Sequence, residues 1–390
     1  MLRYKFGAPS GRYIGPGGQY HVYSESISEV PPHEYGDLPV HKMAPGEFNF
    51  QYGPSTGGLM ESVGITLTTP GELINSVAVD FSFKSRKLNL RGKSIRDALL
   101  TVERINGFHA ASNSLAFLMS VEDALGMEVS EEVQKARILQ LELERIRSHL
   151  EVIKRLCEPA GFGVPVNQLG YLREKISRII SRAAGHRFFF GANAPGYCSV
   201  SGSGVNEKLR EAGKEFQRIY AGLLESKIFL NRLQNNGLTR DNLLTGPAAR
   251  ASGLRHDSRI DSAALPYGDT PFYPVIREEK DCFGRFNVRG EEILNSIDII
   301  ASLGNIKETG KPSLQEGDGQ GCARLESPQG DIFYYAGLNN GLIEDIWHVS
   351  PGTLNIRAFQ ESMKGNIFTD FHFNWESFGI WISEVGVVFQ

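Results

Sequence analysis

The sequence is poor in cysteine, and its four cysteines lie far apart without any CxxC pair. Zinc ribbons, iron–sulfur clusters held by the chain itself and redox dithiols all need closely spaced thiols. This spacing therefore excludes those three kinds of site within the chain. We expect ordinary buried thiols, as is usual for free cysteine in a reducing compartment, at the following positions: Cys157, Cys198, Cys282 and Cys322.

Long apolar runs and a strong net charge are also missing. No window approaches the roughly 18 consecutive apolar residues of a membrane-spanning helix, and the opening segment MLRYKFGAPSGRY lacks the apolar stretch of a signal peptide. With 41 basic and 45 acidic residues, the net charge of -4 does not favour nucleic acid as a partner. The glycine-rich stretches lack the spacing of nucleotide-binding loops. We expect the chain itself to stay in the cytosol.

The residues that are present favour one large folded unit. An apolar content of 41% over 390 residues is ample for a buried core. Residues 1–50 are rich in glycine, proline, histidine and tyrosine without clear periodicity, which predicts an extended N-terminal arm. Residues 51–390 show no repeat or low-complexity linker, so we expect a single domain there.

Local patterns predict a mainly helical α+β fold with a small antiparallel β part. The alternating run at 64–83 surrounds Pro70-Gly71 and predicts a hairpin. Helical spacing from Ser94 predicts two long helices meeting near residues 106–109. Ser130, followed by two glutamates, predicts the capped start of a long helix. Further helices are expected at 171–184, 206–234, 287–303 and 358–364, and strands within 321–356.

Five segments, taken together and in order, resemble the large subunit of group 4 membrane-bound [NiFe] hydrogenases and the 49 kDa subunit of complex I. The resemblance runs from about Tyr52 to the C-terminus and implies the family's helical-bundle fold. The segments are YGPSTGGLMES (52–62), ERINGFHAASNSLAF (103–117), LELERIRSHLEVI (141–153), GPAARASGLRHDSRID (246–261) and SFGIWISEV (377–385).

The sequence departs from the hydrogenases at the nickel ligands. In that family four thiolates from two CxxC pairs bind nickel, because soft sulfur donors suit this metal. The corresponding positions here are Asn106, His109, Trp381 and Glu384, and none of them can supply a thiolate. We therefore expect a hydrogenase-related form that is not an active [NiFe] hydrogenase, with no cofactor or metal bound by this chain.

The sequence also departs from complex I. There the emptied cavity holds a quinone headgroup through a tyrosine and a histidine. The tyrosine position is Gly107 here, and the histidine falls near Met60. Neither hydrogen-bonding group is present for a standard quinone site.

Three retained residues match family positions that face the cavity. The resemblance gives Glu61 a role in passing protons, and gives Arg104 and Arg250 a role in orienting polar groups. Burial raises and pairing lowers the pKa of such a carboxylate, which suits a relay. The alternative is that these residues form structural ion pairs. His149, within the same family helix, is expected to be a packed structural residue.

His109 and Glu384 are expected to face each other in the former metal cavity, with Asn106 beside them. An imidazole and a carboxylate can bind a hard or borderline metal, or can protonate a substrate. The alternative is a hydrogen-bonded plug that fills the vacated volume with the help of Trp381.

A basic cluster replaces another stretch of the family motif and has two interpretations. In one interpretation it binds a neighbouring subunit that carries an iron–sulfur cluster, or a ligand that carries a phosphate group. In the other it is a solvated face. The cluster consists of Lys84, Arg86, Lys87, Arg91 and Lys93.

The resemblance implies a subunit in the hydrophilic arm of a membrane-bound oxidoreductase, peripheral on the cytoplasmic side of the membrane. The implied partners are a small subunit carrying a [4Fe-4S] cluster beside the cavity, a complex I 30 kDa-like subunit and a membrane-arm subunit. In one hypothesis electrons pass through the cavity to a quinone or another acceptor with coupled ion translocation. In the other, the chain is a non-catalytic scaffold joining iron–sulfur subunits to the membrane arm. An open polar tunnel to His109 and Glu384 favours the first, and a cavity filled by Trp381 and Phe108 favours the second.

Overall fold

The structure, a computed structural model of the chain, includes an N-terminal antiparallel sheet of three strands, β1 (Pro9–Gly15), β2 (Gly18–Tyr23) and β3 (Ile27–Val30). About half of the arm expected at 1–50 lies outside the described residues, and its separation from a single domain at 51–390 stays a prediction. Beyond these strands, the structure describes residues 42–55, 59–240, 244–261, 265–306, 312 and 317–389.

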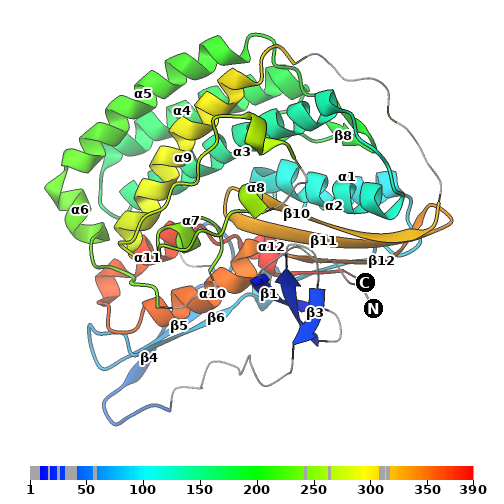
Figure 1. Cartoon of the computed structure of the whole chain (residues 1–390). Helices are drawn as coiled ribbons and strands as arrows, with labels where there is room; N and C mark the ends of the chain where they lie inside the picture. Colours follow the sequence, from blue (N-terminus) through cyan, green and yellow to red (C-terminus); the bar gives the residue numbers. More distant parts are fainter. Residues whose placement is uncertain are drawn as a thin grey trace.

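Four long helices form the body of the molecule: α3 (Glu131–Cys157), α4 (Gly163–Ala184), α5 (Val205–Glu225) and α9 (Cys282–Ser302). α3 packs against α4 and α9, and α5 packs against the same two helices (Figure 1). Their facing apolar side chains make the largest core cluster. The predicted helical bundle is confirmed.

The start of α3 follows the pattern expected from its sequence. The Ser130 hydroxyl accepts a hydrogen bond from the Val133 amide at 3.5 Å, and Glu131 and Glu132 occupy the first turn. Carboxylates there interact favourably with the helix dipole. α3 is buried along nearly its whole length, charged residues included, so it forms the central axis of the bundle.

The helices predicted at 171–184 and 206–234 have different bounds in the structure. α4 starts at Gly163 rather than Tyr171, so its first two turns were missed. The expected helix at 206–234 is split at Ser226 into α5 and α6 (Lys227–Leu233). The split has a local cause, because the backbone of Ser226 is extended and its side chain accepts from the Phe229 amide to cap α6.

The two helices expected to meet near residues 106–109 do meet there, but the first is shorter than predicted. α1 (Ile95–Val102) has 8 residues, and α2 (Ala110–Ala124) follows the single 3-10 turn η3 (Gly107–His109). Asn106 has an extended backbone, and its side chain accepts from the Phe108 amide at 2.9 Å. This cap fixes the turn that carries His109.

The predicted hairpin at 64–83 is confirmed and belongs to a three-stranded antiparallel sheet. Its strands are β5 (Gly64–Thr69) and β6 (Ser76–Asp80), with Leu67 opposite Val77. β4 (Phe48–Tyr52) pairs with the other edge of β5. The sheet buries apolar side chains of β5 against the C-terminal helices.

A second antiparallel sheet has the order β10 (Gly319–Ser327), β11 (Gly330–Asn339) and β12 (Leu342–Val349). α2 covers one of its faces (Figure 1). Gly321 makes this close packing possible, since a Cβ there would overlap the backbone of Ser120 and Ala124 in α2. This glycine-rich stretch therefore serves helix-on-sheet packing.

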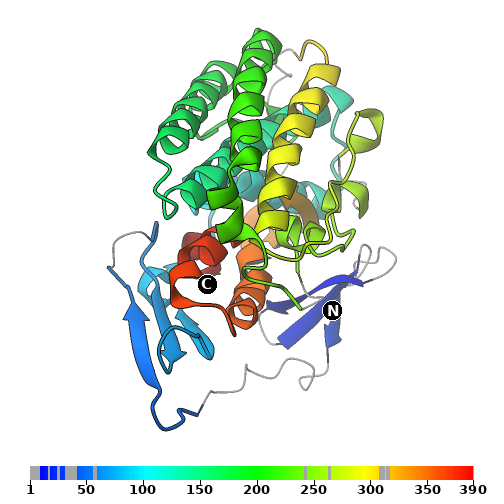
Figure 2. The same cartoon turned by 90° about the vertical axis from the view of Figure 1, so that its left-hand side faces the viewer.

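The C-terminal part consists of short elements, and the last of them pairs with a strand from the first quarter of the chain. α10 (Pro351–Ser362) begins earlier than the helix predicted at 358–364. α11 (Phe371–Phe378) and α12 (Ile382–Val385) follow, and β13 (Val387–Phe389) pairs in parallel with β7 (Arg86–Leu88). Figure 2 shows the orange-to-red C-terminal helices below the bundle, between the β4–β6 sheet and the N-terminal strands. This pairing brings α12 beside η3.

The remaining described elements are short and connect the larger ones. In the described part of the chain, no helix is both long and apolar enough to cross a membrane. The fold is mainly helical α+β, as predicted. The short elements are η2 (Ser82–Lys84), β8 (Asn193–Ala194), β9 (Tyr197–Cys198), α7 (Gly246–Arg250), α8 (Ser258–Asp261), η4 (Tyr267–Asp269) and η5 (Phe368–Asp370).

Candidate functional site

The structure brings His109 and Glu384 together at the junction of η3 and α12. The His109 Nδ1 atom lies 2.8 Å from the Glu384 Oε1 atom, although 275 positions separate the two residues in the sequence. The exposed fraction is 0% for His109 and 2% for Glu384. A contact this short is a hydrogen bond, and the burial of both groups shields it from solvent.

Neighbouring polar groups occupy the remaining hydrogen-bonding positions of the pair. Asn106 and Asn113 each donate to the Glu384 Oε1 atom at 3.2 Å. The His109 Nε2 atom lies 3.0 Å from the Ser148 hydroxyl. Both imidazole nitrogens therefore have partners within the protein.

The electrostatic balance keeps Glu384 ionised. Burial by itself raises the pKa of this carboxyl group, but the positive charge of His109 and the hydrogen bonds from His109, Asn113 and Asn106 outweigh it. The net result is a pKa below the ordinary value of 4.5. At neutral pH Glu384 is thus a buried carboxylate held by hydrogen bonds.

Four residues that support this pair were not singled out from the sequence. Asn113 follows His109 by one helical turn, so its position within the same motif was a usable signal. Ser148 lies in the family helix α3. Tyr334 donates to Asn113 at 2.9 Å and Gln329 donates to Ser148 at 3.1 Å. Nothing in the local sequence pattern pointed to these last two, because a strand and a tight turn of the distant β10–β12 sheet supply them.

An aromatic pair covers the buried contact between His109 and Glu384. The rings of Phe108 and Trp381 stack with centroids 4.9 Å apart and planes at 23°. Trp381 also contacts the edge of the His109 ring, at 5.6 Å between centroids. Arg147 lies over Phe108 at 5.5 Å and donates to the carbonyl groups of Gly107 and Phe108. Trp381 is 8% exposed, so the former metal cavity is filled.

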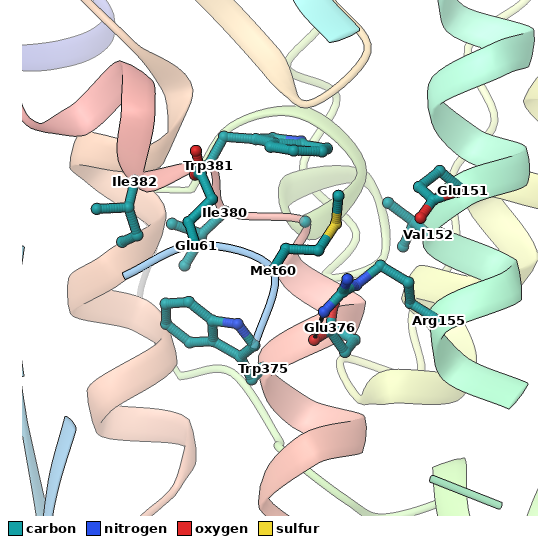
Figure 3. Close-up of a pocket in the computed structure, with 11 residues that line it drawn as sticks. Met60, Glu61, Glu151, Val152, Arg155, Trp375, Glu376, Ile380, Trp381 and Ile382 are labelled. Atoms are coloured by element: carbon teal, nitrogen blue, oxygen red, sulfur yellow. Dashed lines mark hydrogen bonds and ion pairs between the residues drawn. The ribbon is translucent and has the colours of Figure 1, made fainter. Parts of the chain in front are cut away.

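A small pocket has Trp381 in its wall (Figure 3). Its walls include Met60, Glu61, Arg155, Glu376 and Trp381. The cavity volume is about 20 Å³, which is enough for one water molecule but not for a quinone headgroup. The buried Trp381 Nε1 group has no hydrogen-bond partner among the residues that the structure describes.

Glu61 is fixed at this pocket by the start of α12. Its Oε2 atom accepts a hydrogen bond from the Ser383 amide at 2.9 Å, and its Oε1 atom lies 3.8 Å from the Lys84 ammonium group. Glu61 therefore contacts the segment at 381–384, which carries Glu384. Trp381 belongs to the wall of the Glu61 pocket and also touches His109.

Arg250 lies within a separate, fully buried charge network. Its guanidinium group is 3.0 Å from Asp257, 2.7 Å from Glu292 and 2.6 Å from Glu326. Its exposed fraction is 0%. Burial by itself lowers the pKa of Arg250, but these three carboxylates raise it above its ordinary value. This geometry favours the structural ion-pair alternative for Arg250.

His149 belongs to the same network and packs as expected. Its Nε2 atom lies 2.7 Å from Glu292, and its Nδ1 atom lies 3.2 Å from Arg289. Burial lowers the pKa of His149 to about 3, so the imidazole is neutral. A neutral ring can accept a hydrogen bond from Arg289 while donating one to Glu292.

Arg104 lies apart from both sites. Its side chain is 51% exposed, pairs with Glu103 and rests over the Phe190 ring at 4.7 Å. The structure therefore does not bring Glu61, Arg104 and Arg250 into one cavity. Arg104 is a surface residue on the outer side of the segment that leads to η3.

The residues of the basic cluster do not share one role in the structure. Arg86 donates to the Ile105 carbonyl at 2.6 Å and to the Ser383 carbonyl at 2.8 Å. These bonds hold β7, the turn before η3 and α12 together. Lys87, Arg91 and Lys93 are exposed.

The residues present do not fit a nickel-iron centre. The four former ligand positions hold no sulfur, and the cysteines lie elsewhere in the fold. Burial raises the pKa of Cys157 to about 12 and that of Cys198 to about 11, so these thiols are not thiolate donors at neutral pH. Within the described ranges, no group of three or more histidine, cysteine, aspartate or glutamate side chains is placed to hold a metal ion.

Comparisons with known proteins agree with the motifs. Residues 165–316 match the family described as the 49 kDa subunit of respiratory-chain NADH dehydrogenase. The chain is 31% identical over 304 residues to the NADH-quinone oxidoreductase C/D protein of Phocaeicola vulgatus, covering 72% of this chain and 57% of that longer protein. It is 25% identical over 362 residues to the alpha subunit of the membrane-bound hydrogenase of Pyrococcus furiosus, covering 82% of each.

The fold has a match among solved structures. A chain of the membrane-bound sulfane sulfur reductase, an archaeal respiratory membrane complex, superposes with a TM-score of 0.80 at 19% sequence identity. The match covers 89% of this chain and 100% of the other. At this identity the likeness establishes the fold.

Proposed function

Because this chain belongs to the family of the complex I 49 kDa subunit and the membrane-bound hydrogenase large subunit, we propose that it works as a peripheral subunit of a membrane-bound respiratory complex. Within that complex its closed cavity makes it a non-catalytic connector. It joins iron–sulfur subunits to the membrane arm without activating hydrogen.

The proposed partners follow from the family. One is a small subunit whose [4Fe-4S] cluster lies next to the former metal cavity. A second is a complex I 30 kDa-like subunit, in line with the relatives that are named as C/D proteins of NADH-quinone oxidoreductase. The third is a membrane-arm subunit, which holds the chain on the cytoplasmic side of the membrane.

The proposal of a connector rests on one observation. Phe108 stacks on Trp381 and the two rings cover the contact between His109 and Glu384. Both ring nitrogens of His109 are hydrogen-bonded, and the adjoining pocket has room for a single water molecule. A substrate would have to displace the aromatic pair before reaching His109 or Glu384. The geometry therefore supports a filled cavity.

Metal analysis of the purified complex and of this subunit alone tests the proposal. We expect no nickel in either sample and iron only in the complex, because the sulfur ligands for nickel are absent here. Stoichiometric nickel on the isolated subunit would contradict the closed cavity. Iron on the isolated subunit would place a cluster in this chain and contradict the assignment of the cluster to a partner.

A second candidate function is supported by the pocket of Glu61. In this alternative the pocket widens in the assembled complex, and electrons from the partner's cluster reduce a quinone or another acceptor there, with coupled ion translocation. The supporting observation is the donor group of Trp381, buried at the pocket without a partner in the described structure, near a carboxylate.

Acceptor assays on the intact complex separate the two functions. The acceptors are a short-chain quinone and polysulfide, and the variants are Glu61→Gln and the exposed Glu207→Gln as a matched control. A connector predicts equal rates for both variants in a stably assembled complex. A rate loss of about tenfold or more in Glu61→Gln alone, the usual scale for a proton-transfer group, would favour acceptor reduction at this pocket.

A further inference from the structure

The face of the β10–β12 sheet turned away from α2 has a polar row at one end. In the strand register, Gln320 on β10 is opposite Gly337 on β11, and Gly337 is opposite Asp345 on β12. The neighbouring row on the same face consists of Cys322, Tyr335 and Trp347, because side chains two residues apart share a face. The sheet therefore changes here from an apolar patch to a polar edge.

Gly337 leaves a hollow in this row. It contributes no side chain, and the long Tyr335 side chain reaches across it, since a Cβ at position 337 would lie 3.2 Å from the Tyr335 hydroxyl oxygen and 3.6 Å from the Asp345 Cβ atom. A pocket of about 470 Å³ opens at this place. That volume falls within the range of small-molecule sites.

A β-bulge directs two carboxylates into the pocket. The register between β11 and β12 shifts after Gly337: Gly337 is opposite Asp345, but Leu338 is opposite Ile343, so Glu344 is the extra residue. In a regular strand, neighbouring side chains point to opposite faces, whereas a bulge changes their direction. Glu344 and Asp345 both line the pocket, together with Arg91, Tyr335, Ile346 and Phe389.

Tyr335 contributes a hydroxyl group that has no partner. Its exposed fraction is only 6%, and no described residue forms a hydrogen bond with its hydroxyl group. Burial raises the pKa of Tyr335, and the charges of Asp345 and Glu344 raise it further. The hydroxyl is therefore a protonated donor and acceptor that faces the pocket between these groups.

The carboxylates of Glu344 and Asp345 also do not pair with a cation in the described structure. Among the described residues, neither Glu344 nor Asp345 forms an ion pair, and Asp345 accepts a hydrogen bond from the Ile346 amide at 2.9 Å. Arg91 likewise has no acidic partner in the described structure. Charged groups of both signs thus surround a hollow that also has aromatic and aliphatic walls.

We propose that this pocket binds a small zwitterion that carries an ammonium or guanidinium group and an acidic group. The cation lies between Glu344 and Asp345 and has Tyr335 as a further neighbour. The acidic end of the ligand pairs with Arg91.

Isothermal titration calorimetry of the purified full chain tests the proposal with L-arginine and agmatine as probes. Agmatine has the guanidinium group of arginine but lacks its carboxylate. We expect saturable binding of arginine, and weaker binding of agmatine because Arg91 has no acid to pair with. Asp345→Asn and Glu344→Gln are each expected to weaken binding of arginine about tenfold or more, the scale of one charge-assisted hydrogen bond.

Matched variants distinguish binding at this pocket from a general effect of charge. Glu207→Gln removes an exposed carboxylate elsewhere and is expected to leave binding unchanged. Arg91→Gln is expected to abolish the difference between arginine and agmatine. Glu344 is exposed, so its variant stays informative even if Asp345→Asn does not fold. The proposal is overturned if neither probe binds in the millimolar range, or if both carboxylate variants bind arginine as tightly as the parent chain.

Discussion

Trp381 stacks on Phe108 with ring centroids 4.9 Å apart, and this contact joins the C-terminal segment before α12 to η3. By the resemblance, Trp381 stands where the hydrogenases have a metal ligand, and Phe108 precedes another such position, His109. The stack covers the contact between His109 and Glu384. Large aromatic side chains thus take up volume that an emptied metal site would otherwise leave as a cavity.

Replacing Trp381 with alanine is expected to destabilise the protein strongly. The residue is only 8% exposed, and removing a buried aromatic group of this size costs about 3–5 kcal/mol. The measurement is equilibrium unfolding in urea, followed by far-ultraviolet circular dichroism. Trp381→Phe is the matched control, because a phenyl ring can still stack on Phe108. An equal loss in both variants would show that the stack is not the source of the stability.

Glu384→Gln is expected to alter how stability depends on pH. The folded-state pKa of Glu384 lies below 4.5, so the folded protein binds fewer protons at this group than the unfolded chain. Its contribution is complete above the unfolded value and is lost as the pH falls through the folded value. The glutamine variant lacks this contribution, so its stability should fall less steeply on acidification below about pH 4.5.

The same variant should also be less stable at neutral pH. Removing the carboxylate acceptor of a buried hydrogen-bonded pair costs about 1–3 kcal/mol, because His109 loses its charged partner. Urea unfolding at several pH values measures both effects, with the exposed Glu207→Gln as the control. Parallel pH profiles for Glu384→Gln and the parent chain would contradict the hydrogen bond between His109 and Glu384.

The parts of the fold that could be predicted from sequence are those set by local patterns. Ser130 with its acidic neighbours predicted the start of α3, because capping involves only the first helical turn. Periodicity alone did not place the break at Ser226, because the apolar spacing continues across it. The meeting of His109 with Glu384 came from resemblance to a family, since no local rule connects residues 275 positions apart.

The supporting residues of the candidate site were beyond sequence reasoning for a related reason. Gln329 and Tyr334 reach the site only because the β10–β12 sheet packs on α2 in one particular register. The position of Arg250 depends in the same way on carboxylates from separate segments. Motif matching gave Arg250 a place in a cavity, whereas its three acidic partners lie in the interior of the protein.

Arg250 and Arg104 are expected to respond in opposite ways to substitution. Arg250→Ala removes a cation that three buried carboxylates share, which should cost about 3–5 kcal/mol or prevent folding. Arg104→Ala removes an exposed side chain and should change stability by about 0.5 kcal/mol or less. Thermal and urea unfolding of both variants provide the comparison, with Arg250→Lys retaining the charge.

The electron-transfer rate of the assembled complex gives a second measurement on these variants. If Arg104 has only a surface role, the Arg104→Ala complex should assemble and work as the parent does. A strong rate loss in stably assembled Arg104→Ala would instead give this arginine a functional role at the surface beside η3. A fully stable Arg250→Ala protein would contradict the structural role of its ion pairs.

Gly321→Ala is expected to disturb the packing of α2 on the β10–β12 sheet. A Cβ at position 321 would overlap the backbone of Ser120 and Ala124, and backbone atoms cannot move aside as a flexible side chain can. Overpacking of this kind costs about 1–3 kcal/mol or more. Because α2 begins directly after His109, a shift of this helix should also weaken the contact of His109 with Glu384 and reduce the pH dependence assigned to that pair.

Gly71→Ala provides the control for this last prediction. Gly71 lies in the turn between β5 and β6, where a Cβ would meet no described atom within 4 Å. Alanine there should be neutral or stabilise the protein by up to about 1 kcal/mol, by restricting the unfolded chain. If both alanine variants unfold at the same urea concentration, the close approach of β10 to α2 does not limit stability. In that case the position of His109 depends on the Asn106 cap rather than on the sheet beneath α2.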